Sequence, residues 1–148
     1  MGRKVAEYLD VTFRDTDTDV ERVAGKPIAE IFVEDGEAAF RELEQTAITA
    51  ALDEHDGVLA LGGGAVGNPG TRSQLTNHMV IFLDVGLADA VSRVGLNRDR
   101  PLLLESPRAQ LKKLLDARRP LYEEVASVTV VTSGRGIDDV AEEVIRHV

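Results

Sequence analysis

Four acidic residues stand at alternate positions near the N-terminus, directly after a short strand-like segment. They are Asp15, Asp17, Asp19 and Glu21. Carboxylates two residues apart at the end of a strand can hold Mg²⁺ through water, or accept a proton from a hydroxyl group. A solvated turn whose aspartates cap the next helix would have the same spacing. The spacing therefore leaves a functional and a structural interpretation open.

A glycine triplet, Gly62–Gly64, follows the apolar run Val58–Leu61. Three glycines cost chain entropy and offer no side chain to the core. A triplet in this place indicates either a tight turn or a ligand that lies against the backbone. Arg41 lies on a predicted helix beside the apolar stripe. An ion pair with Glu37, one turn earlier, would explain this arginine without a ligand.

The stretch 93–119 carries eight basic and three acidic side chains, although the whole chain has a net charge of −9. Six of the eight are arginines, whose planar guanidinium groups suit bidentate contacts with phosphate and carboxylate groups. A basic solvated helix face is the alternative, and it fits Lys112 and Lys113. It does not fit Arg98 and Arg100, which fall in a predicted loop, so these two indicate an anion-binding loop.

The composition excludes several classes of protein. The 148 residues include no cysteine, which excludes a disulfide framework, cysteine-ligated metal sites and a thiol nucleophile. The acidic surface repels phosphate backbones and anionic membranes, so we expect neither nucleic-acid nor membrane partners. No apolar run is long enough to span a bilayer, and the first residues are too polar for a secretory signal. We therefore expect a cytoplasmic protein.

Short apolar segments alternate with helical ones, which predicts an α/β sandwich with a parallel sheet. Continuous apolar runs such as 58–61 and 80–83 are typical of strands that are covered on both faces. In such sheets ligands bind beyond the carboxyl ends of the strands, where the acidic residues and the glycine triplet fall. The predicted strands are 11–15, 58–61, 80–83 and 128–131. The predicted helices are 5–9, 20–24, 27–32, 37–52, 71–77, 87–94, 108–125 and 137–148. We expect an interruption of helix 108–125 near Pro120.

Taken together, these segments resemble shikimate kinase along nearly the whole chain. Each segment is weak evidence alone, but their order and spacing are specific to that family. The segments are Asp15-Thr16-Asp17 followed by Glu21 and Gly25, then Ile28–Phe32, Gly36–Glu44, Gly62–Val66, Arg100–Leu103 and Arg118–Tyr122.

The resemblance implies a small P-loop kinase of the α/β class, with a three-layer fold in which helices flank a parallel sheet. Such an enzyme transfers the γ-phosphate of ATP to the 3-hydroxyl group of shikimate, with Mg²⁺, in aromatic amino-acid biosynthesis. Shikimate and ATP would be its small-molecule partners. The resemblance also implies a monomer with a single domain over residues 1–148, which contains a lid over residues 95–107.

The resemblance assigns roles to individual residues. Asp17 would orient the attacking hydroxyl group and act as its base, and Arg100 would reach the transferred phosphate. Asp15 would hold Mg²⁺ through water. The expected shikimate-binding residues are Asp17, Arg41, Gly62, Gly63, Gly64 and Arg118, with Arg41 and Arg118 on the carboxylate. The expected nucleotide-binding residues are Arg93, Arg100 and Arg135.

One motif of the family has no counterpart in the sequence. Shikimate kinases open with a strand and a G-x-x-x-x-G-K-[ST] loop that binds the nucleotide phosphates and Mg²⁺. The 148 residues contain no such motif, and Met1–Arg3 matches the helix that follows it. We therefore expect the first, central strand to be missing and phosphate transfer by these residues alone to be impaired. Strands 58–61 and 80–83 should then be separated by about twice the usual strand spacing of roughly 4.7–4.9 Å.

Two other functions stay open at this point. A non-catalytic paralogue that binds shikimate would also keep Asp17, Arg41 and Arg118 without the loop. Another small P-loop kinase, such as a gluconate-type enzyme, would share the fold, although the Asp15-Thr16-Asp17 segment and Arg41 argue against it. Of the three functions, shikimate kinase explains the most residues.

Overall fold

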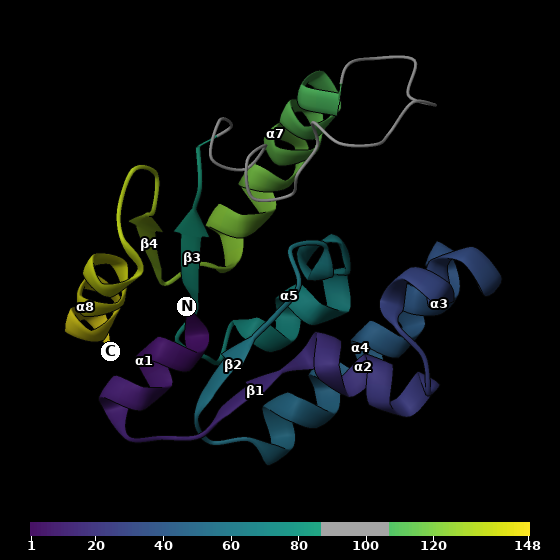
Figure 1. Cartoon of the computed structure of the whole chain (residues 1–148), viewed down its shortest axis with the longest axis horizontal. Helices are drawn as coiled ribbons and strands as arrows, with labels where there is room; N and C mark the ends of the chain where they lie inside the picture. The colour runs from purple at the N-terminus through teal and green to yellow at the C-terminus, as the bar shows by residue number, and fades with distance from the viewer. Residues whose placement is uncertain (87–106) are drawn as a thin grey trace. The chain divides into compact units, whose positions relative to one another are not determined.

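The computed structural model of the chain describes residues 1–86 and 107–148 (Figure 1). These residues form two compact units, Met1–Asn77 and the described part of His78–Val148. Each unit contains one pair of parallel strands with helices packed against it, which confirms the expected α/β class.

The first unit holds the acidic segment and the glycine triplet. Its strands β1 and β2 pair in parallel, with Phe13 opposite Val58 and Asp15 opposite Ala60. The elements in chain order are α1 (Gly2–Leu9), β1 (Phe13–Asp15), α2 (Thr16–Ala24), α3 (Ile28–Glu34), α4 (Glu37–Glu54), β2 (Val58–Ala60), the 3-10 helix η1 (Ala65–Gly67) and α5 (Pro69–Leu75).

A small apolar cluster holds α2, α3 and α4 together. Val20, Ile31 and Phe40 are buried at its centre. Its partly buried rim includes Leu43 and Ala47 on α4. Burial of one large aliphatic or aromatic side chain contributes about 1.5–3 kcal/mol, so this cluster stabilises the packing of the three helices.

Helix α4 buries a stripe that differs from the predicted one. The sequence predicts Phe40, Leu43, Ala47 and Ala51, whereas the buried residues are Phe40, Glu44, Ile48 and Ala51. The buried face is therefore rotated toward a charged residue. Apolar periodicity cannot predict this rotation, because Glu44 owes its place to a polar partner described below.

The acidic segment is helical rather than a turn, which corrects the expected start of the helix at residue 20. Helix α2 begins at Thr16, so that Asp17 and Asp19 lie in its first turn. The cause is the side chain of Asp15, which accepts a hydrogen bond from the backbone N–H of Asp17 at 2.9 Å. The helix ends as expected at Gly25, whose φ of 73° places it in the left-handed region.

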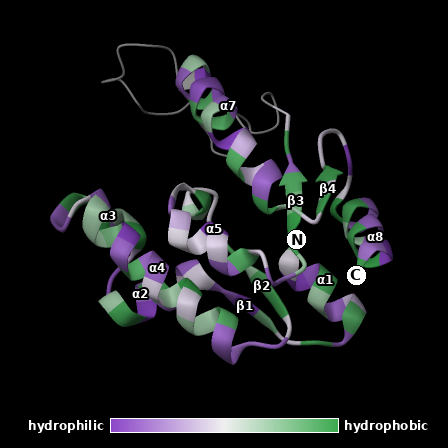
Figure 2. Ribbon diagram, turned by 180° about the vertical axis from the view of Figure 1, so that it is seen from behind, coloured by the Kyte–Doolittle hydropathy of each residue, from purple (hydrophilic) through white to green (hydrophobic). Residues whose placement is uncertain are grey.

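The second unit contains β3 (Ile81–Asp84), α7 (Pro107–Val125), β4 (Val128–Val131) and α8 (Ile137–His147). Strands β3 and β4 pair in parallel. Helix α7 runs through Pro120 without a break, so the expected interruption there is wrong. Helix α8 is amphipathic and buries Val140 and Val144, and Figure 2 shows its hydrophobic and hydrophilic residues on different sides. The predicted helix 87–94 and the predicted lid 95–107 lie outside the described residues, except for Pro107 at the start of α7.

Strands β2 and β3 belong to different two-stranded sheets, and no ladder joins them in the described part of the chain. Because the two strands belong to different units, the expected separation between them stays a prediction. Each residue of β2 is partly exposed, so the strand is less buried than the apolar run 58–61 indicates. A two-stranded sheet leaves one edge of each strand without a neighbouring strand, which explains the partial exposure of β2.

None of the described helices combines the length and apolar character needed to cross a bilayer.

Candidate functional site

The parallel pairing of β1 and β2 brings the acidic segment to the glycine triplet. Because Asp15 lies opposite Ala60, the residues that follow both strands leave the sheet at the same edge. A Cβ atom added at Gly62 would lie 3.2 Å from Oδ1 of Asp17. A Cβ atom added at Gly64 would lie 2.5 Å from both terminal nitrogens of Arg41. The absence of side chains at these glycines therefore leaves room for the carboxylate and the guanidinium group.

Arg41 is held mainly by Glu44, one turn later on α4. Its Nη1 donates to Oε1 of Glu44 at 2.8 Å, whereas its Nη2 lies 3.6 Å from Oε1 of Glu37. The guanidinium group also lies 5.2 Å from the centre of the Phe40 ring. The simple surface pair with Glu37 is thus the weaker contact, and Arg41 is oriented toward the glycine triplet.

Glu44 is a functional candidate that the sequence analysis missed. Its side chain is 5% exposed, it pairs with Arg41, and its charge acts on Asp17. A buried carboxylate is costly unless it is paired, so the contact with Arg41 explains its burial. The available signal was its position three residues after Arg41, which places both on one face of the helix.

Asp17 lies in a strongly negative environment. Burial raises the pKa of its carboxyl group above the ordinary value, and the nearby charges of Asp15, Glu44 and Glu21 raise it further. Arg41 acts in the opposite direction. A carboxylate with a raised pKa is a stronger proton acceptor than an ordinary aspartate, as a base for a hydroxyl group needs to be.

Asp15 has one carboxylate oxygen committed to the backbone. Its Oδ1 accepts from the N–H of Asp17. Among the described residues, no three acidic, cysteine or histidine side chains come together as a metal site. Mg²⁺ usually keeps several waters and takes only one or two carboxylates from the protein. The second oxygen of Asp15 fits that kind of contact, whereas a complete protein cage is absent from the part of the chain that the structure describes.

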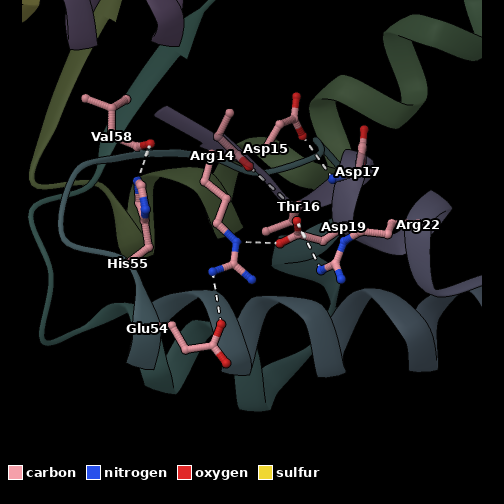
Figure 3. Close-up of polar contacts among 10 residues, drawn as sticks. Arg14, Asp15, Thr16, Asp17, Asp19, Arg22, Glu54, His55 and Val58 are labelled. Atoms are coloured by element: carbon pink, nitrogen blue, oxygen red, sulfur yellow. Dashed lines mark hydrogen bonds and ion pairs between the residues drawn. The ribbon is translucent and has the colours of Figure 1, made fainter. Parts of the chain in front are cut away.

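An ion-pair network fixes the first turn of α2 against β1 and α4 (Figure 3). Nε of Arg14 donates to Oδ2 of Asp19 at 2.6 Å, and Nη1 of Arg14 donates to Oε2 of Glu54 at 3.1 Å. These hydrogen bonds raise the pKa of Arg14. Arg22 lies 3.8 Å from the other oxygen of Asp19. Asp19 is therefore a structural residue, and the network holds the turn that carries Asp17.

The remaining predicted site residues lie elsewhere in the chain. Arg118 and Arg135 belong to the second unit. Nη1 of Arg135 donates to Oε1 of Glu143 at 2.7 Å and to a strand carbonyl at 2.8 Å, so its guanidinium group is engaged within the unit. Arg93 and Arg100 lie outside the described residues. The structure thus brings together Asp15, Asp17, Arg41 and the glycine triplet, and it describes Arg118 and Arg135 separately.

Comparisons with known proteins identify the family of the chain. The family model described as shikimate kinase matches residues 1–148. A shikimate kinase of Salinispora arenicola is 58% identical over 144 residues, which are 97% of this chain and 86% of that protein. A shikimate kinase of Saccharopolyspora erythraea is 54% identical over 149 aligned positions, which cover 100% of this chain and 85% of that protein.

Solved structures give the same result. The shikimate kinase of Acinetobacter baumannii in complex with shikimate superimposes with a TM-score of 0.89 at 34% identity, and the match covers 99% of this chain and 83% of that one. The shikimate kinase of Aquifex aeolicus gives a TM-score of 0.74 at 26% identity, with 99% of this chain and 85% of that one covered.

Proposed function

The chain belongs to the shikimate kinase family, and on that premise we propose which of its residues serve each part of the reaction. The function is transfer of the γ-phosphate of ATP to the 3-hydroxyl group of shikimate, a step of aromatic amino-acid biosynthesis. The chain is therefore a transferase of the P-loop kinase class.

The acceptor site is formed by Asp17, Arg41 and the triplet Gly62–Gly64. Shikimate carries a carboxylate, which suits the planar guanidinium group of Arg41. It also carries hydroxyl groups, and the raised pKa of Asp17 suits a base that orients and deprotonates one of them. The glycines leave room for both of these side chains beside the backbone. The observation that carries this assignment is the close approach of Asp17 and Arg41 to the same triplet.

The other roles extend this proposal. Arg118 of the second unit binds the shikimate carboxylate as a second arginine, and Arg93, Arg100 and Arg135 serve the nucleotide. Asp15 holds Mg²⁺ through water, and the ion, when bound, neutralises negative charge on the phosphates of ATP. The protein is also proposed to be cytoplasmic and to act as a monomer, without nucleic-acid or membrane partners. The net charge of −9 supports the absence of such partners, because an acidic surface repels phosphate groups.

A matched pair of glycine variants tests the acceptor site. Replacing Arg41 itself would leave Glu44 buried without its partner, so a loss of binding could reflect a loss of folding. Gly64→Ala instead adds one methyl group against the flexible end of Arg41. Gly67→Ala adds the same group in open space nearby, where no atom lies within 4 Å.

We expect Gly64→Ala to weaken shikimate binding on the order of tenfold, the loss of one charge-assisted contact, with a stability change within about 0.5 kcal/mol. Gly67→Ala should change neither. Calorimetric titration with shikimate and urea unfolding measure both quantities. Equal shikimate affinity of the two variants would contradict the assignment of Arg41 and the triplet to the acceptor site.

A further inference from the structure

Two neighbouring arginines on α7 have different surroundings. Arg119 makes a bidentate ion pair with Asp84, the last residue of β3: its Nη1 and Nη2 donate to Oδ2 and Oδ1 at 2.9 and 2.7 Å. Arg118 is partly buried, and it makes no hydrogen bond or ion pair with any residue that the structure describes. Arg119 therefore contacts the sheet, whereas the donors of Arg118 are available to a ligand.

Aromatic contacts accompany the ion pair. The guanidinium group of Arg119 lies 5.8 Å from the centre of the Phe82 ring, and that ring stacks on Tyr122 at a centroid distance of 4.7 Å. Phe82 belongs to β3 and Tyr122 to α7. The same face of the helix thus contacts the same strand through a charged pair and a stacked pair, which together fix the rotation of the helix about its axis.

Asp84, the partner of Arg119 on β3, is itself fixed by hydrogen bonds. The backbone carbonyl of Asp84 accepts hydrogen bonds from the backbone N–H of Thr132 at 2.9 Å and from its hydroxyl group at 3.3 Å. Thr132 is 3% exposed. The carboxylate of Asp84 therefore projects from a fixed point at the carboxyl end of β3, the edge at which ligands bind in parallel α/β sheets.

Helix α7 is weakened next to Arg119, so the ion pair with Asp84 stabilises it where support is needed. Pro120 follows Arg119 directly and has no backbone N–H, so α7 lacks one of its ladder hydrogen bonds there. A helix weakened at one turn can bend or rotate locally. Consecutive residues of an α-helix are about 100° apart around the axis, so holding Arg119 also sets the direction in which Arg118 leaves the helix.

We propose that the pair of Arg119 and Asp84 positions Arg118 for the carboxylate of the acceptor. This inference rests on the proposed function of Arg118. Arg119 is a positioning residue, because its own donors are occupied by Asp84. The ion pair is partly exposed, with side-chain exposures of 44% and 21%, and such pairs contribute little to stability. Its main consequence is therefore orientation.

The test compares two ligands that differ only at the carboxylate, shikimate and its methyl ester. Calorimetric titration of the full chain gives the affinity for each, and urea unfolding reports stability. Arg119→Gln should weaken shikimate binding about three- to tenfold, part of the loss expected for one charge-assisted contact, and should leave ester binding unchanged. Asp84→Asn should have the same selective effect. Lys112→Gln, which removes an exposed pair with Asp116 on the same helix, is the control and should change neither affinity.

A double variant provides a rescue. Exchanging the charges, Asp84→Arg together with Arg119→Asp, restores an ion pair between β3 and α7 and should recover more shikimate affinity than either single change retains. If Arg119→Gln and Asp84→Asn weaken both ligands equally, or neither, positioning is wrong. Arg118→Gln separates this failure from that of the proposed function: it should reduce the preference for shikimate over the ester. An unchanged preference would overturn the role of Arg118 and the positioning inference with it.

Discussion

Asp17 is proposed to bind shikimate, but burial of its charged form lowers the stability of the chain at neutral pH. Burial raises the pKa of its carboxyl group, and the charges of Asp15 and Glu44 raise it further. Between the ordinary pKa of 3.8 and the higher folded value, the folded chain holds a proton that the unfolded chain has lost. The stability from this group is therefore full below the ordinary pKa, and it is lost as the pH rises through the folded pKa.

We predict that Asp17→Asn stabilises the chain at neutral pH and weakens shikimate binding. The gain is below about 1 kcal/mol, because the group is partly exposed and solvent screens its charge. The gain should shrink as the pH falls toward 3.8, where the wild-type carboxyl group also becomes neutral. Urea unfolding over a pH series measures it, with the exposed Asp53→Asn as the control. Destabilisation at neutral pH would mean that the attraction of Arg41 outweighs burial.

Single residues of the site differ in how well the sequence predicts them. Asp17, Arg41 and the glycines could be proposed from the sequence because their types and spacing match a known family, and the structure brings them together. Glu44 could not, because an acidic residue on a helix is normally exposed. Its burial follows from the 2.8 Å contact with Arg41 and from the space beside Gly62, and both require the tertiary structure.

Helix α2 depends on the residue that precedes it. Asp15 is its N-cap, and a carboxylate oxygen of this residue satisfies the backbone N–H of Asp17. The negative charge also interacts favourably with the positive end of the helix dipole. The same residue is the proposed Mg²⁺ partner, so its structural and functional roles must be separated by the choice of substitution.

We predict that Asp15→Ala lowers the free energy of unfolding by about 1 kcal/mol, whereas Asp15→Asn stays within about 0.5 kcal/mol of the wild type. Asparagine caps a helix nearly as well as aspartate, but it lacks the charge. Urea unfolding measures both. Asn68→Ala removes the comparable cap of α5 and should cost a similar amount without affecting shikimate affinity. If Asp15→Asn were as unstable as Asp15→Ala, the charge would matter more than the cap.

The elements could be predicted wherever local periodicity determines them. The helices near residues 5–9 and 37–52 and the strand 128–131 follow from apolar spacing alone. The start of α2 was misplaced because aspartates at a helix N-terminus look like a polar turn in the sequence. The continuity of α7 was missed because proline usually ends a helix, whereas here the contacts of Arg119 and Tyr122 with β3 hold the helix on both sides of Pro120.

At the scale of the whole chain, the sequence contains the residues proposed for the acceptor site but not the loop expected to bind the phosphates of the donor. Asp17, Arg41 and the glycine triplet lie together within the first unit. The 148 residues contain no G-x-x-x-x-G-K-[ST] motif. Phosphoryl transfer depends on the positioning of the donor phosphates and the neutralisation of their charge, which such a loop provides through its amides and its lysine.

We therefore predict that a polypeptide of these 148 residues binds shikimate but transfers phosphate from ATP slowly. The transfer rate should be at least roughly 10³-fold lower than that of a longer chain in which a strand and such a loop precede Met1. Removal of a single hydrogen-bond donor that stabilises the transition state typically lowers the rate about 10²–10³-fold, and here several donors are absent together. Calorimetry and a coupled ADP assay measure binding and transfer separately. A longer chain with alanine in place of the loop lysine is the control for the added length. Equal transfer rates of the short and long chains would show that other residues of this sequence hold the phosphates.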